Sequence, residues 1–341
     1  MPNVLTYGSI NIDDIFLVDD IIKPGETISA LNYTVLAGGK GANQSVALAK
    51  ASQGSNVTIT HAGNIGEDGK WILKLMEDAG VDTSLVTIDA TVRTGRAIIQ
   101  VSKTTGNNSI ILYAGANKSI HQADAERILS QFHSNNTPTW LVLQNEISSL
   151  DFIIPYAYRK GYTIAFNTAP CPIELVSTIP IKECHILIMN ESEAASVARQ
   201  LLNVNFEKDL DISNTEIIGK RLFDVLPSLR LAVVTLGSQG SVAIYSTSKR
   251  GNLKTARQPA LSDVEVVDTT GAGDVFIGYF LTELSQGWHG TEAELNDKVV
   301  SKALTLATTA AGIACESCGA MGSVPLRDVV IQRTRSVEEI F

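Results

Sequence analysis

Two aspartates near the end of the chain flank a glycine-rich turn. Asp268 and Asp274 enclose Thr-Thr-Gly-Ala-Gly within VEVVDTTGAGDVFIGYFL, residues 264–281. The run before the turn predicts a strand and the apolar run after it predicts a helix, so Asp274 would lie in the first helical turn. The N–H groups of residues 271–273 can then form an anion-binding turn that the helix dipole reinforces. An acid at this position can also serve only as a partner of the dipole.

A second motif combines a glycine pair with a lysine and an asparagine. Residues 38–44 read GGKGANQ. Glycine lets another group approach the backbone, and the predicted helix that follows begins with free N–H groups. Together with Lys40 and Asn43, this helix start suits a polyhydroxylated or phosphorylated ligand. It is not a G-x-x-x-x-G-K-[ST] loop, because Gly41 follows the lysine. A glycine turn that only begins a helix is the alternative.

Two further motifs come directly after predicted strands. Asn190 and Glu193 follow the buried run HILIM and share one face of the next predicted helix. Strand ends of this kind bind ligands in open α/β sheets, and oxygen ligands suit a hydrated Mg²⁺. The same spacing is typical of a helix capping box, which the pattern alone favours. Thr235 to Gly240 reads TLGSQG and predicts either a nucleotide contact or a hairpin turn.

The elements that would position these motifs alternate along the chain. Short apolar runs predict buried strands, and the runs between them predict helices. The predicted strands cover residues 4–10, 56–63, 140–146, 162–168, 185–190 and 229–237. The predicted helices cover residues 41–51, 69–80, 123–133, 150–161 and 191–202. This alternation predicts an α/β fold with a parallel sheet that has helices on both faces.

Two segments break this alternation. Residues 11–37 and 93–113 contain short alternating patterns without a helix between the paired runs. They predict antiparallel strands of a small sheet beside the main body. Residues 203–215 are polar and without periodicity, which predicts a surface loop, and the tail from Arg327 predicts a polar helix or a frayed end. A single α/β domain of 341 residues is a common size.

Composition excludes several functions. The chain is 44% hydrophobic and has a formal net charge of −9. It has no Lys/Arg cluster, so no nucleic-acid partner is expected. The N-terminus lacks the pattern of a signal peptide, and every apolar run is far shorter than the ~20 residues of a membrane span, so no membrane partner is expected. With four cysteines and no disulfide pattern, we expect a reduced cytoplasmic protein, with the nucleus as a second location.

Other reaction classes have weak support in the sequence. Cys315 and Cys318 form a single C-x-x-C pair, which is a weak basis for a zinc or redox site. No H-E-x-x-H or G-x-S-x-G motif is present. A dinucleotide-dependent oxidoreductase requires G-x-G-x-x-G after the first strand, and that strand leads instead into Gly8-Ser-Ile-Asn11. In the later turn, Phe276 stands where the third glycine would be.

Together, the four motifs resemble the signatures of the ribokinase family of carbohydrate kinases, also called the PfkB family. Residues 38–44 are similar to its N-terminal signature, and residues 268–274 are similar to its C-terminal signature. Residues 190–193 are similar to its Asn-x-x-Glu motif, and residues 235–240 to its nucleotide loop. The resemblance extends from about Leu5 to Arg327, and the motifs follow one another in the family's order.

The resemblance implies one kinase domain over residues 1–341. Its fold would be a three-layer α/β/α sandwich with a mostly parallel central sheet and a small β-sheet lid. Segments 11–37 and 93–113 would supply the lid strands, through which two copies would form a homodimer. The implied reaction moves the γ-phosphoryl group of ATP to a primary hydroxyl, O5 of D-ribose, with Mg²⁺ and with K⁺ as an activating ion.

The resemblance also leaves alternative functions. A fructokinase-like or pseudouridine-kinase-like enzyme would use the same motifs on another acceptor. A catalytically silent sugar-binding regulator is the alternative from a different class. Asp14 and Phe16, which follow Asp13, depart from the family pattern and so bear on the choice of sugar.

By the same resemblance, individual positions receive roles. The catalytic residues would be Asp274 as the base and Gly271, Ala272 and Gly273 as the anion-binding turn. The substrate ligands would be Asn11, Asp13, Gly39, Lys40, Asn43, Glu146 and Asp274. The nucleotide ligands would be Asn190, Thr235, Gly237, Ser238, Gly240, Gly273 and Thr308. Mg²⁺ would be held through water by Asn190 and Glu193, and K⁺ by Asp268, Thr270, Ala314, Ser317, Gly319 and Ser323. Segments 114–117 and 167–170 are also similar to family segments.

Overall fold

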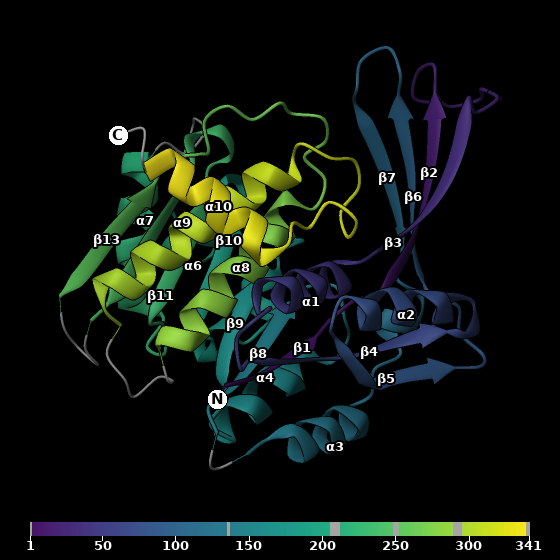
Figure 1. Ribbon diagram of the computed structural model, residues 1–341. Helices are drawn as coiled ribbons and strands as arrows, with labels where there is room; N and C mark the ends of the chain where they lie inside the picture. The colour runs from purple at the N-terminus through teal and green to yellow at the C-terminus, as the bar shows by residue number, and fades with distance from the viewer. Residues whose placement is uncertain (1, 135–136, 205–211, 248–251, 289–294, 339–341) are drawn as a thin grey trace.

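A computed structural model describes residues 2–134, 137–204, 212–247, 252–288 and 295–338. It contains a nine-stranded sheet and a separate four-stranded sheet. Figure 1 shows helices packed along the larger sheet, while the smaller sheet projects from the body at the upper right. The predicted α/β/α sandwich with a β lid is therefore confirmed.

The larger sheet is parallel except at one edge. In spatial order its strands are β13 (Leu253–Gln258), β12 (Ser241–Ser246), β11 (Leu231–Thr235), β10 (Ile186–Asn190), β9 (Thr163–Asn167), β8 (Thr139–Gln144), β1 (Asn3–Tyr7), β4 (Thr58–Gly66) and β5 (Asp82–Asp89). The pairs from β5 to β11 are parallel, and the hairpin β12–β13 adds antiparallel pairs. The six predicted strands correspond to β1, β4 and β8 to β11. The prediction missed β12 and the two edge strands, β5 and β13, whose half-exposed sides carry polar residues that hide the apolar pattern.

Helices cover both faces of this sheet. One face packs against α1 (Lys40–Ala51), α2 (Lys70–Asp78), α8 (Ala272–Gly287), α9 (Asp297–Ala314) and α10 (Arg327–Glu338). The other packs against α3 (Gln122–Phe132), α4 (Leu150–Arg159), α5 (Leu175–Thr178), α6 (Glu191–Leu202) and α7 (Ile212–Val225). Adjacent residues of β8 alternate between the two cores, with Val142 in one and Leu141 in the other. Among the described residues, none of these helices combines the length and the apolar character needed to cross a bilayer.

Close packing of α1 on α8 brings two of the sequence motifs together. Gly278 of α8 lies against α1, where an added Cβ would overlap the Ala47 side chain. The two helices run side by side in Figure 1. Because α1 carries GGKGANQ at its start and α8 carries the Asp274 turn at its start, this contact sets the distance between them.

The lid is built from two hairpins joined side by side. Its strands, in spatial order, are β3 (Asn32–Gly38), β2 (Asn11–Val18), β6 (Gly95–Ser102) and β7 (Asn108–Tyr113). The pairs β2–β3 and β6–β7 are antiparallel, as predicted, but the central pair β2–β6 is parallel. The prediction of an entirely antiparallel lid is therefore wrong at its centre. Each hairpin starts from the body, so both first strands run outward in the same direction.

The predicted strand at residues 264–267 is absent. This segment is irregular, and Val266 and Val267 are 64% and 56% exposed. The N–H groups of Val267 and Asp268 donate instead to the carbonyl of Cys315, at 2.8 and 3.1 Å. The two β-branched residues therefore suggested a strand, although the sheet already ends at β13. As a result, Asp268 lies in a loop rather than at the end of a strand.

The structure also revises two terminal and loop predictions. Of the predicted loop at 203–215, residues 203–204 are irregular, residues 205–211 lie outside the described residues, and α7 begins at Ile212. The tail from Arg327 forms α10, which favours the helical alternative over a frayed end.

Candidate active site

Asp274 is buried at the start of α8 and is held by two amides. The residue as a whole is only 9% exposed. The Asn43 side-chain amide donates to its Oδ2 at 3.1 Å, and the Gln44 amide donates to its Oδ1 at 2.9 Å. Burial raises the pKa of Asp274, while the positive charge of Lys40 and the two amide hydrogen bonds oppose that rise. The result is a positioned carboxylate whose pKa is shifted upward, as expected of a general base.

The glycine turn before Asp274 adopts a conformation that other residues avoid. Gly271 has φ of +79°, and an added Cβ would lie 2.6 Å from the Ala320 side chain. The N–H of Ala272 donates to the carbonyl of Thr269 at 3.2 Å, so this predicted anion donor already serves the turn. Gly273 is exposed and has open space around its Cα, which lets a ligand approach the N-terminus of α8.

A cluster of carboxylates surrounds Lys40 at the start of α1. Burial lowers the pKa of Lys40, but Asp274, Glu146, Glu193 and Asp13 together raise it above its ordinary value. Glu146, just after β8, accepts hydrogen bonds from the Ser9 hydroxyl at 2.5 Å and from the Lys40 N–H at 3.2 Å. The lysine therefore compensates negative charge contributed by four separate elements.

Asp13 enters the same cluster from the lid. Its carboxylate rests on Gly38, where a Cβ would overlap it, which explains the first glycine of GGKGANQ. Burial, followed by the charges of Glu146, Asp14 and Asp274, raises the pKa of Asp13 to about 7. The neighbouring lid residue Asn11 accepts a hydrogen bond from the Asn117 amide at 2.7 Å. Asn11 and Asp13, at the start of β2, thus place the inner end of the lid next to the carboxylate cluster on the body.

The lid residues that depart from the family pattern face away from this cluster. Asp14 accepts hydrogen bonds from the Tyr33 hydroxyl at 2.6 Å and from Arg96 at 2.7 Å. Phe16 stacks on Tyr33 with ring centroids 4.8 Å apart. Since successive strand residues point to opposite faces, Asp14 and Phe16 lie on the face opposite Asp13. This placement gives no support to the prediction that they bear on the choice of sugar, which stays a prediction.

Asn190 and Glu193 form a capping box at the start of α6. The Asn190 side chain accepts from the Glu193 N–H at 2.9 Å, and the Glu193 carboxylate accepts from the Asn190 N–H at 3.0 Å. The capping interpretation is confirmed, yet both residues also line a cavity of about 140 Å³ together with Lys40 and Asp274. Burial raises the pKa of Glu193, so this carboxylate is well placed to gain from a cation.

A second cavity of about 500 Å³ adjoins the first. Thr235 and Gly273 line both cavities. The larger one contains six of the seven predicted nucleotide ligands, Thr235, Gly237, Ser238, Gly240, Gly273 and Thr308. The seventh, Asn190, lies in the smaller cavity. The TLGSQG segment is a hairpin turn between β11 and β12, and it lines the cavity at the same time.

The comparisons with known proteins match this arrangement. A model of the pfkB family of carbohydrate kinases matches residues 1–327. The chain belongs to this family. It is accordingly a phosphotransferase that acts on a sugar hydroxyl. The fold, with a β lid above the ends of parallel strands, is the one that the family's solved structures share with it.

Full-length relatives of this pfkB-family chain include ribokinases. The chain is 30% identical to the ribokinase of Haemophilus influenzae over 97% of its own length and 98% of that protein. It spans 56% of a bifunctional ribokinase/ribose-5-phosphate isomerase A of Fructilactobacillus sanfranciscensis, at 29% identity over 97% of its own length.

Two solved ribokinase structures resemble it closely. That of Cryptococcus neoformans var. grubii, in complex with ADP, is 32% identical and superposes with a TM-score of 0.79 over 98% of this chain and 100% of the other. That of Arabidopsis thaliana, complexed with ribose and ATP, is 27% identical, with a TM-score of 0.75 over 98% and 99%.

In this pfkB-family chain, the residues predicted to bind K⁺ lie in two segments that meet, the loop before α8 and the end of α9 with the loop that follows it. Asp268 accepts hydrogen bonds at 2.9 Å from the N–H groups of Thr270 and Gly319. Burial opposes ionisation of Asp268, but these hydrogen bonds hold its pKa below the usual range. The Ala314 carbonyl accepts from the Ser317 N–H at 3.2 Å, and the Ser323 hydroxyl donates to the Ala320 carbonyl at 3.0 Å. The hydrogen bonds thus hold Asp268 against the loop that follows α9.

This loop contains the C-x-x-C pair. Cys315 and Cys318 are free thiols, as are Cys171 and Cys184. Within the described part of the chain, no group of three His, Cys, Asp or Glu side chains could hold a metal ion.

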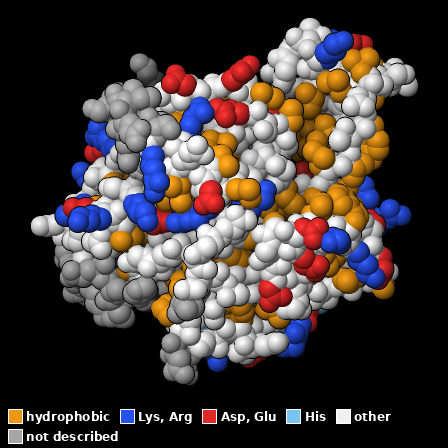
Figure 2. All heavy atoms as spheres, viewed as in Figure 1, with side chains coloured by type: hydrophobic (Ala, Val, Ile, Leu, Met, Phe, Trp, Pro, Cys, Tyr) orange, Lys and Arg blue, Asp and Glu red, His pale blue; other side chains and the backbone are white. Residues whose placement is uncertain are grey.

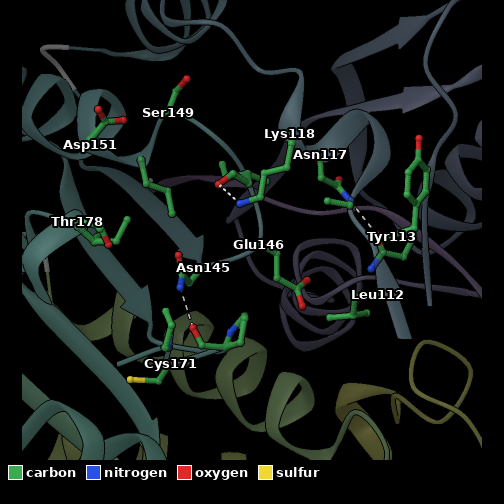
Figure 3. Close-up of a pocket in the computed structure, with 17 residues that line it drawn as sticks. Leu112, Tyr113, Asn117, Lys118, Asn145, Glu146, Ser149, Asp151, Cys171 and Thr178 are labelled. Atoms are coloured by element: carbon green, nitrogen blue, oxygen red, sulfur yellow. Dashed lines mark hydrogen bonds between the residues drawn. The ribbon is translucent and has the colours of Figure 1, made fainter. Parts of the chain in front are cut away.

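A wide cleft of about 880 Å³ opens beside the carboxylate cluster. Figure 3 shows Glu146 in this cleft, with Asn117 and Tyr113 on one side and Asn145 and Cys171 on another. Its polar groups are partly occupied, since Lys118 donates to the Ile147 carbonyl at 3.0 Å and Asn145 donates to the Pro170 carbonyl at 2.7 Å. Because Asn11 also lines the cleft, a substrate that receives the phosphoryl group can reach the carboxylate cluster from this side.

The sequence did not single out three residues that support the site. Ser9 binds Glu146, and Gln44 and Gln144 form a buried amide chain that ends at Asp274. Gln44 belongs to GGKGANQ, so the motif contained a signal for it. Gln144 had no comparable signal, because a glutamine at the end of a buried strand resembles an ordinary boundary residue.

Proposed function

We propose that this protein phosphorylates D-ribose at O5 with ATP. One observation carries the proposal: buried Asp274 lies where the Asn11–Asp13–Glu146 cluster meets a cavity that adjoins a second cavity able to hold a nucleotide. Full-length similarity to ribokinases, including solved complexes with ADP or with ribose and ATP, supports ribose and ATP as the substrates.

In the proposed reaction, Asp274 accepts the proton of the attacking hydroxyl. Phosphoryl transfer has a loose transition state, so positioning and charge stabilisation matter more than base strength. Asn43 and Gln44 orient the carboxylate toward the substrate side. The N-terminus of α8 at Gly273 and the charge of Lys40 would stabilise the phosphoryl oxygens. The lid residues Asn11 and Asp13 would hold sugar hydroxyls and help to exclude water.

Asn190 and Glu193 fit a role toward Mg²⁺. Glu193 is a buried carboxylate that makes no ion pair with another described residue, and both Asn190 and Glu193 border the cavity next to Asp274. We propose that they hold the ion through water. When bound, Mg²⁺ neutralises charge on the transferring phosphate.

An assay of ADP release tests the proposed function. Purified protein is incubated with MgATP and with D-ribose, D-fructose or a nucleoside, in K⁺ or Na⁺ buffer. We expect the highest kcat/KM with ribose and phosphorylation at O5 in the product. A clear preference for fructose or a nucleoside would reassign the acceptor, and absence of turnover with every acceptor would favour a silent sugar-binding regulator.

Glu193→Gln should weaken Mg²⁺ binding while keeping the backbone hydrogen bonds of the helix start. The glutamine amide oxygen can still accept the Asn190 N–H, so the capping box persists, while the second contact, from the Asn190 side-chain amide to the other carboxylate oxygen, is lost. We expect the half-saturating concentration of free Mg²⁺ to rise by about tenfold, because one negative charge is lost near the ion. The control is Glu191→Gln in the same helical turn. Equal Mg²⁺ requirements in the two variants would contradict the role of Glu193.

Ribose affinity should increase as pH rises through about 7. Since the pKa of Asp13 is raised to about 7, its carboxyl is protonated below that pH and ionised above it. An ionised carboxylate accepts stronger hydrogen bonds from sugar hydroxyls, so KM for ribose should fall between pH 6 and pH 8. Asp13→Asn should abolish this dependence. Asp14→Asn, on the opposite face of β2, should retain the dependence with its midpoint at lower pH, because the charge of Asp14 helps to raise the pKa of Asp13. Loss of the dependence in both variants would contradict this assignment.

We propose that two copies pair through their lids. The face that carries Asp13 is aliphatic further out, where Ile110 and Leu112 are 51% and 57% exposed. The opposite face mixes apolar residues with the Asp14–Arg96 ion pair. Figure 2 shows hydrophobic side chains gathered on the lid at the upper right. Such a patch on a projecting sheet is typical of a protein–protein interface.

Ile110→Glu should convert the dimer into monomers, because a charge would be buried in an aliphatic interface. Analytical ultracentrifugation at micromolar concentration measures the change. The control is Ile111→Glu, which alters the adjacent residue on the other face of the lid. A monomeric wild type, or a dimeric Ile110→Glu protein, would show that the lid does not form the interface. Since the same face covers the sugar site, we also expect monomers to have a raised KM for ribose.

Three further sequence predictions stay proposals. We propose K⁺ activation through the loops at Asp268 and Gly319, which the K⁺ and Na⁺ arms of the assay measure. We keep one kinase domain over residues 1–341 and a cytoplasmic location as proposals. A nuclear location has no support.

A further inference from the structure

A chain of buried side-chain amides leads from β8 to Asp274, the proposed catalytic base. The Gln144 side chain donates to the Gln44 carbonyl oxygen at 2.6 Å, and the Gln44 Nε2 donates to Asp274 Oδ1 at 2.9 Å. Both glutamines are fully buried. Gln144 therefore touches Gln44, and Gln44 touches Asp274, but Gln144 lies one residue further from the substrate.

The chemistry of these groups gives the chain one direction. An ionised carboxylate only accepts hydrogen bonds, so the Gln44 atom that faces Asp274 must be its NH₂ group. The same NH₂ group also donates to the side-chain oxygen Oδ1 of Asn167 at 3.3 Å, and the side-chain NH₂ group of Asn167 donates to the Ile188 carbonyl at 3.0 Å. With its NH₂ group committed, the carbonyl oxygen of Gln44 needs a donor, and Gln144 supplies it.

This arrangement leaves the far end of Gln144 in an unfavourable place. Its Oε1 is buried and accepts no hydrogen bond from the described residues. It points at Gly8, where an added Cβ would overlap it. A buried acceptor without a partner is destabilising. Rotating the amide would relieve this only by turning the Gln144 oxygen toward the Gln44 oxygen, which would place two acceptors against each other. The orientation of Gln144 is thus determined by its contact with Gln44.

We propose that Gln144 is a positioning residue for the phosphoryl transfer, acting through Gln44 to keep an NH₂ group aimed at Asp274. This inference rests on the proposed function. Without the donor at residue 144, Gln44 can rotate and turn its carbonyl oxygen toward Asp274, which then favours the protonated, inactive carboxyl. The other charged groups that face Asp274 are Lys40, Glu146, Glu193 and Asp13, and the substitution leaves all four in place.

The pH dependence of ribose phosphorylation tests this inference. Gln144→Met keeps the approximate volume of the side chain and removes its donor. We expect kcat to fall by about tenfold and the acid limb of the kcat profile to move up by roughly one pH unit. KM for ribose should change by less than about twofold, since the sugar contacts remain. Gln122→Met, an exposed change at the start of α3, is the control.

A double-mutant cycle separates positioning from a general loss of stability. In a Gln44→Met background, Gln144→Met should have no further effect on the pH profile, because its only route to Asp274 has been removed. Additive shifts in the cycle, or a lowered Tm with an unchanged profile, would overturn the inference. Failure of the wild type to phosphorylate ribose would instead refute the proposed function, so the two failures are distinguishable.

Discussion

Replacing Asp274 by asparagine is expected to lower kcat for ribose phosphorylation by about 10²- to 10⁴-fold. The carboxylate is buried at the start of α8, and Asn43 and Gln44 each donate to one of its oxygens. Asparagine has a similar shape but cannot accept the proton of the sugar hydroxyl. Because the proposed sugar contacts from Asn11, Asp13 and Glu146 persist, ribose binding measured by calorimetry should weaken far less than kcat.

The asparagine variant also places an NH₂ group against one of the two donors, so its stability has to be compared with that of the wild type by thermal unfolding. Asp124→Asn, which removes another acid from the first turn of a helix, is the matched control. It tests whether loss of a favourable helix-dipole contact alone reduces activity. Turnover near the wild-type rate in Asp274→Asn would refute the assignment of Asp274 as the base.

Replacing Lys40 by methionine is expected to reduce kcat/KM by about 10²- to 10³-fold and to move the acid limb of the pH profile upward. Lys40 lies among Asp274, Glu146, Glu193 and Asp13, which raise its pKa and keep it charged. In turn, its charge lowers the pKa of Asp274. Without that charge, a larger fraction of Asp274 is protonated at neutral pH, and the phosphoryl oxygens lose a cation that would stabilise them.

The matched control is Lys70→Met, which changes the first residue of α2 at the protein surface. A variant that merely lost a surface charge would behave like this control. If Lys40→Met lowered kcat/KM while the acid limb stayed in place, Lys40 would act on the substrate alone and not on the base. Measurement of kcat/KM and kcat from pH 5.5 to pH 9 distinguishes these effects, since they report on the free enzyme and the complex respectively.

Local pattern predicted the central part of the fold. A strand such as β8 is buried on both faces and reads as an unbroken apolar run, so the parallel core of the sheet could be recognised from residue types. The strands β5 and β13 lie at the edges, where mixed exposure hides this signal. The strand prediction for residues 264–267 failed in the opposite way. The valines of this segment suit a strand, but no neighbouring strand is there to pair with them.

For the site, the sequence by itself determined which residues can do chemistry. The glycine turn, the lysine at a helix start and the acids at strand ends were visible because each motif is short and each residue type has a limited chemistry. Only the tertiary structure decided which of these residues meet. The packing of α1 on α8 aims Asn43 and Gln44 at Asp274, and the pleat of β2 turns Asp13 toward the cluster while Asp14 turns away. Contacts of this kind join residues far apart in the chain, so no local periodicity records them, and Gln144 became visible only through such a contact.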